Sequence, residues 1–323
     1  MRTESSMLWV AAAGAILVGG AWAGLGGPAS AQAGRIQVAV TEADIETIVL
    51  AVGGDEVSTT HLFRGCILKP DLEVRAEAAE RLASAEAVVW TGFFNESRAV
   101  HSWLEALPAE RRAELKPPTW IDVSHDVLRV NVPVSACDGY LDLQFMPGDP
   151  FFWLNPENGA VIAQNVAEGL GRLRPARRST FVANAATFAR DLESRIQVWK
   201  RELELLSDLR VFSAHCGWQN LSRIGGPHFI ACRKNPGSLR PPDALAAQLA
   251  TLGLDVILVD PNTPAEYAEA FRKATTAEVI VVPSSIADLP GAATYPALFD
   301  NLVEKLRTAV DARRGSVETP VSR

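Results

Sequence analysis

A long polar helix pattern divides this chain into two halves that are organised alike. From about Thr180 to Leu206 the sequence contains no Pro or Gly and carries many charged residues between Arg190 and Glu202, which predicts one helix of about 27 residues. Such a helix would be ~40 Å long at 1.5 Å per residue. On each side of it, short apolar segments alternate with amphipathic ones, a pattern typical of parallel sheets in α/β proteins.

Strand and helix patterns follow one another in both halves. Strands are predicted at 36–41, 57–63, 87–90 and 119–123, then at 209–214, 228–231, 256–259 and 279–282. Helices are predicted at 42–53, 77–84, 98–107 and 158–173, then at 242–252, 263–275 and 295–310. We therefore expect an α/β fold with two α/β lobes, each built on a parallel sheet, joined by one long connecting helix. The alternative is a single large α/β domain with an external helix.

These segments also give the expected domain boundaries. Residues 34–178 would form the N-terminal lobe, 179–207 the connecting helix and 208–312 the C-terminal lobe, with a flexible polar tail at 313–323.

The first 33 residues are typical of an export signal. Arg2 precedes an apolar run from Met7 to Ala23, and Ala29 to Ala33 has the small-residue pattern of a cleavage site. We expect residues 1–33 to be a signal peptide, cleaved after Ala33, which would place the protein in a periplasmic or extracellular space. A membrane anchor is the alternative, because the run approaches the length of a bilayer span. Its glycines and the following Pro28 favour the signal peptide.

Composition and motifs narrow the function. The formal net charge is -7, which argues against nucleic acid or an anionic membrane as the main partner. The sequence contains no His-Glu-x-x-His, Gly-x-Ser-x-Gly or Gly-x-x-x-x-Gly-Lys signature. We therefore expect a binding protein rather than an enzyme.

A set of short motifs resembles one protein family over essentially the whole mature sequence. The chain resembles the periplasmic metal-binding receptors of zinc- and manganese-importing ABC transporters. The motifs that carry the resemblance, in chain order, are Ala51 to Asp55, Ala85 to Gly92, Gly148 to Pro156, Val211 to His215, Asn235-Pro236-Gly237, Leu289-Pro290-Gly291, Tyr295 and Asn301. The resemblance implies a monomer that captures zinc or manganese in a cleft between two lobes and delivers it to a membrane permease.

The metal ligands of that family are only partly present. The first ligand position falls near Asp71, where no histidine occurs, and the second falls on Phe151. The third falls on His215, and the fourth falls at Ser284 or Ser285 instead of an aspartate. The resemblance therefore predicts the scaffold more firmly than its usual metal site.

Two interpretations of the cysteines remain open. A rebuilt site could use Cys66, Cys216 and His125 as metal ligands, which would suit zinc or copper(I). Acidic residues in loops after strands, where open α/β sheets bind ligands, could contribute as well; these are Asp71, Asp260 and Asp288. Alternatively the cysteines form disulfides within each lobe, Cys66 with Cys137 and Cys216 with Cys232, as an oxidising compartment permits.

A third interpretation replaces the bare ion with a larger ligand. Phe151, Phe93 and Trp218 could line the cleft, and an aromatic pocket suits a metal chelate or a small organic molecule. The protein could also be a non-transport accessory or interaction protein whose cleft is closed by Phe151.

Overall fold

The computed structural model describes residues 34–62, 76–92, 94–115, 119–129, 149–214, 216–232, 241–291 and 293–317. They contain two four-stranded sheets, and every strand pair in both sheets is parallel. This is the two-lobed α/β fold that the sequence predicts. In the described part of the chain, no helix is both long and apolar enough to cross a bilayer. The expected lobe boundaries remain predictions.

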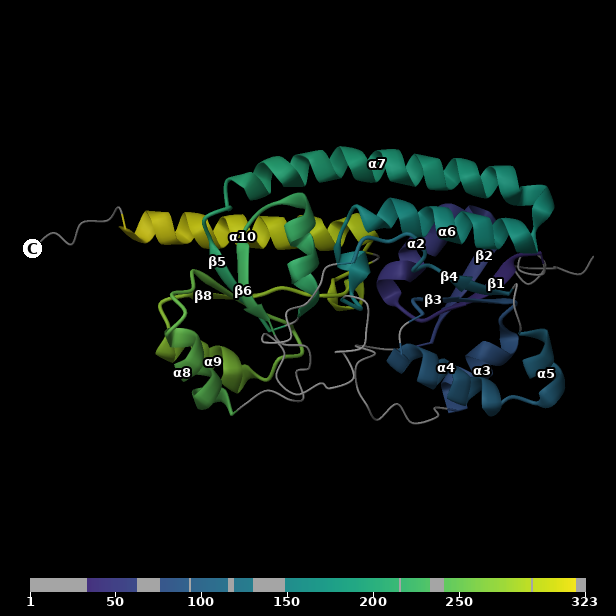
Figure 1. The fold of residues 1–323 in the computed structure, drawn as a ribbon, viewed down its shortest axis with the longest axis horizontal. Coiled ribbons are helices and arrows are strands. Elements are labelled where there is room, and N and C mark those ends of the chain that lie inside the picture. The colour runs from purple at the N-terminus through teal and green to yellow at the C-terminus, as the bar shows by residue number, and fades with distance from the viewer. Residues whose placement is uncertain are drawn as a thin grey trace, which may run out of the picture. The chain divides into compact units, whose positions relative to one another are not determined.

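The first sheet has the strand order β2-β1-β3-β4. Its strands are β1 (Ile36–Val40), β2 (Val57–His61), β3 (Ala87–Trp90) and β4 (Trp120–Asp122). One face packs against α2 (Ala43–Gly53) and α6 (Asn158–Leu173), and the other against α3 (Ala76–Ser84) and α4 (Phe94–Glu105) (Figure 1). Successive side chains along β1 point to opposite faces of the sheet. Ile36, Val38 and Val40 therefore belong to one core cluster and Ala39 to the other.

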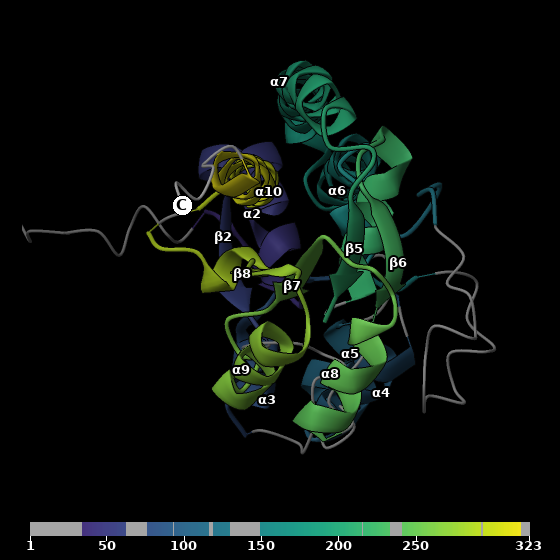
Figure 2. The same ribbon diagram turned by 90° about the vertical axis from the view of Figure 1, so that its left-hand side faces the viewer.

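The second sheet repeats this plan with the order β6-β5-β7-β8. Its strands are β5 (Arg210–Ser213), β6 (His228–Cys232), β7 (Val256–Val259) and β8 (Glu278–Val281). Helices α8 (Pro242–Ala250) and α9 (Ala265–Ala274) cover one face, and α10 (Tyr295–Val317) covers the other (Figures 1 and 2). Strand β7 is buried along its whole length, as expected of a strand covered on both faces.

Helix α7 is the predicted connecting helix. It spans Arg178–Glu204, 27 residues, two residues before the predicted start and end. Its buried side chains recur at helical spacing and join a core cluster that also contains residues of both sheets, α6 and α10. The lobes therefore share one hydrophobic core, and each lobe also has a smaller cluster of its own on the opposite face of its sheet.

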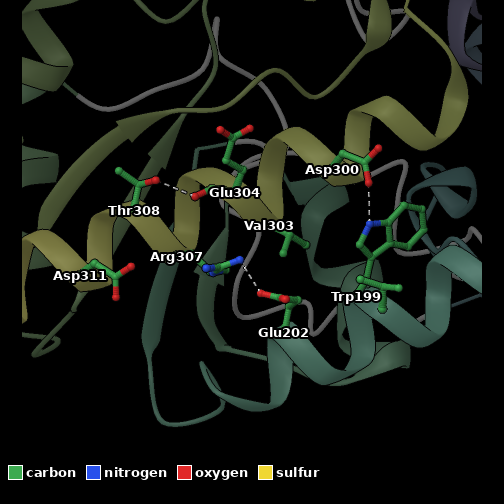
Figure 3. Close-up of a pocket in the computed structure, with 9 residues that line it drawn as sticks. Trp199, Glu202, Asp300, Val303, Glu304, Arg307, Thr308 and Asp311 are labelled. Atoms are coloured by element: carbon green, nitrogen blue, oxygen red, sulfur yellow. Dashed lines mark hydrogen bonds and ion pairs between the residues drawn. The ribbon is translucent and has the colours of Figure 1, made fainter.

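A groove between α7 and α10 has charged edges that are paired across it (Figure 3). Asp300 accepts hydrogen bonds from Trp199 Nε1 at 2.8 Å and from Arg195 Nη1 at 2.5 Å. Arg307 forms an ion pair with Glu202 at 2.8 Å. Because these groups satisfy one another, the groove is a packing seam between the two helices.

Three helices differ most from the predictions. Helix α4 begins at Phe94 instead of Arg98, and Glu96 in its first turn suits a helix start electrostatically. Helix α5 (Ala109–Glu114) was not predicted, because it buries no residue and so has no apolar stripe. Helix α10 continues to Val317, past 310 and into the expected flexible tail at 313–323, since no Pro interrupts it there.

Gly159 allows α6 to pack closely against α7 and α10. A Cβ on Gly159 would lie 2.6 Å from Leu192 Cδ2 and 2.7 Å from the buried Tyr295 ring. We predict that Gly159→Ala lowers the free energy of unfolding by about 1–3 kcal/mol, measured by urea denaturation, although alanine favours helices.

Gly171→Ala in the same helix is the matched control. Its Cβ would lie 2.9 Å from Arg178 Cγ and 3.3 Å from Arg178 Cβ, and rotation of this exposed side chain about its Cα–Cβ bond would relieve the closer contact. This variant should be as stable as the wild type or more stable. Equal stability of the two variants would show that packing at Gly159 is not tight.

Candidate functional site

The carboxyl ends of the strands carry most of the buried charge in the described residues. In a parallel sheet these ends lie at one edge, which is where open α/β sheets bind ligands. In the first lobe, Glu42 and Asp44 follow β1 and Glu96 follows β3. In the second lobe, Asp260 follows β7. All four residues are buried, so the strand ends form the candidate site.

Asp44 joins the two lobes. Its carboxylate accepts a hydrogen bond from Trp153 Nε1 at 3.2 Å and one from the Ile286 backbone N–H at 2.8 Å. The Ser285 side chain also favours the ionised form of this carboxylate. Burial raises the pKa of Asp44 to about 6, and these hydrogen bonds, which favour the ionised form, limit the rise.

The contact between the two lobes is the junction, and the segment Asp149–Asn155 forms its centre. Asp149 Oδ1 accepts a hydrogen bond from the Phe151 backbone N–H at 2.8 Å, and Oδ2 accepts one from Gln219 Nε2 at 2.5 Å. Tyr295 O–H donates to the Trp153 carbonyl. Gln219 and Tyr295 belong to the second half of the chain, so this segment is bonded to both lobes.

Phe151 lies inside this junction. Its side chain is buried, 6% exposed, and its ring packs edge-on against Trp153 with centroids 5.5 Å apart. Trp218, also suggested as cleft lining, is buried against Phe299. Both aromatics therefore belong to the shared core in this structure, and their contact with a ligand stays a prediction.

The second-lobe loops form a compact polar cluster around Asp260. Ser284 donates to Asp260 Oδ2 through its backbone N–H at 3.2 Å and its hydroxyl at 2.5 Å. Asn262 Nδ2 lies 3.3 Å from oxygens of both Asp260 and Asp288. The fold thus brings together Ser284, Asp288 and Asp260, which the sequence placed in loops after strands.

In the first lobe, Glu96 is fully buried. Its carboxylate accepts hydrogen bonds from the backbone N–H and the hydroxyl of Thr91.

His125 lies at the outer edge of the site. Its side chain is 73% exposed, and Nε2 is 3.9 Å from Asp122 Oδ2. His125 is therefore accessible to a ligand, but its side chain is not held inside the junction.

Several predicted site residues cannot be compared with the structure. Cys66, Asp71, Phe93, Cys137 and His215 lie outside the described residues. Cys216 begins a 3-10 helix and Cys232 ends β6, but their side chains are not described, so both disulfides remain predictions. Among the side chains that are described, no three His, Cys, Asp or Glu groups converge as a ready metal site.

Three acidic residues of the junction were not identified from the sequence. Glu42, Asp44 and Glu96 follow strands β1 and β3 directly or within a few residues. The rule that selected Asp260 and Asp288, an acidic residue in a loop after a strand, would have found Glu96, which lies between the predicted strand at 87–90 and the predicted helix at 98–107. It misses Glu42 and Asp44, because both fall inside the helix predicted at 42–53.

Asp44 should make folding stability depend on pH. Its folded-state pKa of about 6 lies above its value in an unfolded chain, about 3.9, so the folded state binds more protons between these values. Ionisation of Asp44 therefore costs stability as pH rises from 4 through 6, by up to about 3 kcal/mol. We predict that metal-free wild type loses stability relative to Asp44→Asn between pH 4.5 and 7.5, measured by urea denaturation.

Asp55→Asn is the control for this prediction. The Asp55 side chain is fully exposed, so its removal should leave the pH dependence unchanged. A stability difference between wild type and Asp44→Asn that stays constant with pH would contradict the role given to Asp44.

A family model described as ZnuA, zinc-uptake complex component A periplasmic, matches residues 38–309. The high-affinity zinc uptake system protein ZnuA of Brucella abortus (strain 2308) is 26% identical over 165 residues, 49% of this chain and 49% of that protein. The chain thus matches about half the length of these curated relatives.

Solved structures match over a longer range. The periplasmic zinc-binding protein TroA from Treponema pallidum has a TM-score of 0.66 and 19% identity, covering 86% of this chain and 99% of that one. The substrate-binding protein FpvC from Pseudomonas aeruginosa, in complex with Mn²⁺, has a TM-score of 0.65 and 19% identity, covering 87% and 99%. At these identities the likeness establishes the fold.

Proposed function

The chain belongs to the family of periplasmic zinc-uptake complex component A, and from this we propose that it is the substrate-binding protein of a metal-type ABC importer. It would capture a divalent metal, zinc or manganese, between its two lobes and deliver it to a permease in the membrane. The family is one of transport receptors, and we propose that this member likewise catalyses no reaction.

The bond between Asp44 and Ile286 carries this proposal. Asp44 lies just after the first strand of the first sheet, and Ile286 lies in the loop after the last strand of the second. The carboxyl ends of the two parallel sheets therefore meet, and a cargo held there would be contacted by loops of both lobes.

The donor groups at these strand ends suit a divalent cation. The described carboxylates are oxygen donors, which suit manganese, whereas His215 and His125 would add nitrogen donors and Cys66 and Cys216 sulfur donors that suit zinc. We propose that the metal ligands come from these residues. Asp71, Ser284 and Asp288 are proposed as further residues of the ligand cleft.

Export and docking complete the proposed role. Residues 1–33 would direct export and be cleaved after Ala33, which would release a monomer into the periplasmic or extracellular space. Paired charges along α7 and α10 oppose large lobe movements, so a loaded protein would differ from an empty one by small lobe shifts. The permease would read these shifts at the rim of both lobes.

Metal binding should stabilise the folded protein, because a ligand bound only by the folded state adds to its stability. At a metal concentration about 100-fold above Kd, the gain is about 2.7 kcal/mol. We predict that Zn²⁺ or Mn²⁺ raises the Tm of chelator-treated protein by at least about 5 °C. His215→Ala should lose most of that rise.

His228→Ala is the matched control, since His228 is exposed at the amino end of β6, away from the strand ends that form the site. It should keep the full rise in Tm. If no divalent ion raises the Tm of the wild type, capture of a bare metal is wrong. A metal chelate or an accessory role with Phe151 closing the site would then be the explanation.

A further inference from the structure

Glu42 differs from the other buried acids at the strand ends. It follows Thr41 at the carboxyl end of β1, one of the two central strands of the first sheet, and its side chain is only 8% exposed. It occupies the position before α2, but its side chain makes no capping hydrogen bond to that helix. No hydrogen bond or ion pair joins its carboxylate to any group in the described part of the chain.

The neighbouring acids are satisfied by the protein itself. Asp44 is hydrogen-bonded by Trp153 and Ile286, and Glu96 is hydrogen-bonded by Thr91. Buried polar groups in folded proteins are almost always hydrogen-bonded, because an unsatisfied one loses its solvation without compensation. An unpartnered carboxylate among satisfied ones therefore indicates that a group beyond the described residues completes it.

The charge around Glu42 specifies what that group is. Burial raises the pKa of Glu42 well above its usual range, and the negative charges of Asp44 and Glu96 raise it further. An anion would add to this repulsion. A cation would offset both the burial and the surrounding negative charge, so the site selects for positive charge.

We propose that Glu42 is a direct ligand of the transported divalent cation, and that its carboxylate favours an oxygen-preferring ion such as Mn²⁺. This inference rests on the proposed transport function. Carboxylate oxygens suit harder ions such as Mn²⁺ better than sulfur-rich sites do. Glu96, still bonded to Thr91, contributes negative charge near the ion, and water can supply remaining ligands.

The test is titration of the mature, metal-free protein with MnCl₂ and separately with ZnCl₂ by isothermal titration calorimetry. Glu42→Gln keeps the shape of the side chain and removes its charge. We expect it to weaken Mn²⁺ binding at least about tenfold, and to weaken Zn²⁺ binding less. Glu46→Gln removes the same charge one turn further along α2, at a half-buried position, and should bind both ions like the wild type.

A second variant shows whether a loss of Mn²⁺ affinity in Glu42→Gln could come from misfolding. Glu42→Asp keeps the charge and withdraws the carboxylate by one methylene, and circular dichroism would check the fold of each variant. It should also weaken Mn²⁺ binding, because ligand distances to a metal are narrowly defined. Wild-type Mn²⁺ affinity in a folded Glu42→Gln or Glu42→Asp variant would overturn this inference.

Different results would refute the transport function and the role of Glu42. If the wild type binds neither ion, metal transport is wrong and the role of Glu42 is wrong with it. If the wild type binds Mn²⁺ and Glu42→Gln binds it equally well, transport stands and only the assignment of Glu42 is refuted.

Discussion

The arrangement of the two lobes depends on one buried carboxylate. Asp44 stands at the start of α2, and its oxygens accept hydrogen bonds from Trp153, in the segment before α6, and from Ile286, in the loop after β8. Burying a carboxylate costs several kcal/mol unless hydrogen bonds replace its hydration. The loops that supply those bonds are therefore constrained to stay at the junction, and the junction holds both lobes.

Further hydrogen bonds connect the same segments into a network. Tyr295 O–H donates to the Trp153 carbonyl, and Gln219 donates to Asp149, so the segment Asp149–Asn155 is held from two places in the second half of the chain. The aromatic rings of that segment fill the space between the lobes and belong to the same core cluster as α7. A lobe movement must strain these bonds and this packing together, which favours small changes over a wide opening.

Local pattern predicted most of the fold. Strands β3 and β7 and helix α6 have the predicted boundaries, because apolar period and helix-ending residues are local signals. Helix α5 was not predicted because its contacts are with residues far from it in the sequence. Arg111 donates hydrogen bonds to the carbonyls of Ala83 and Ala85, so α5 needs no apolar face.

For the candidate site, the sequence determined which residue types stand at the strand ends, because strand and helix periods place Ser284 and Asp288 in loops at one edge of a parallel sheet. Only the tertiary structure decided which acids are satisfied and which are not. Asp44 and Glu42 stand two positions apart and look equivalent in the sequence, yet Trp153 and Ile286 reach Asp44 and no described side chain reaches Glu42. The partners of Asp44 are more than a hundred residues away along the chain, so its hydrogen bonds form only when the two lobes pack together.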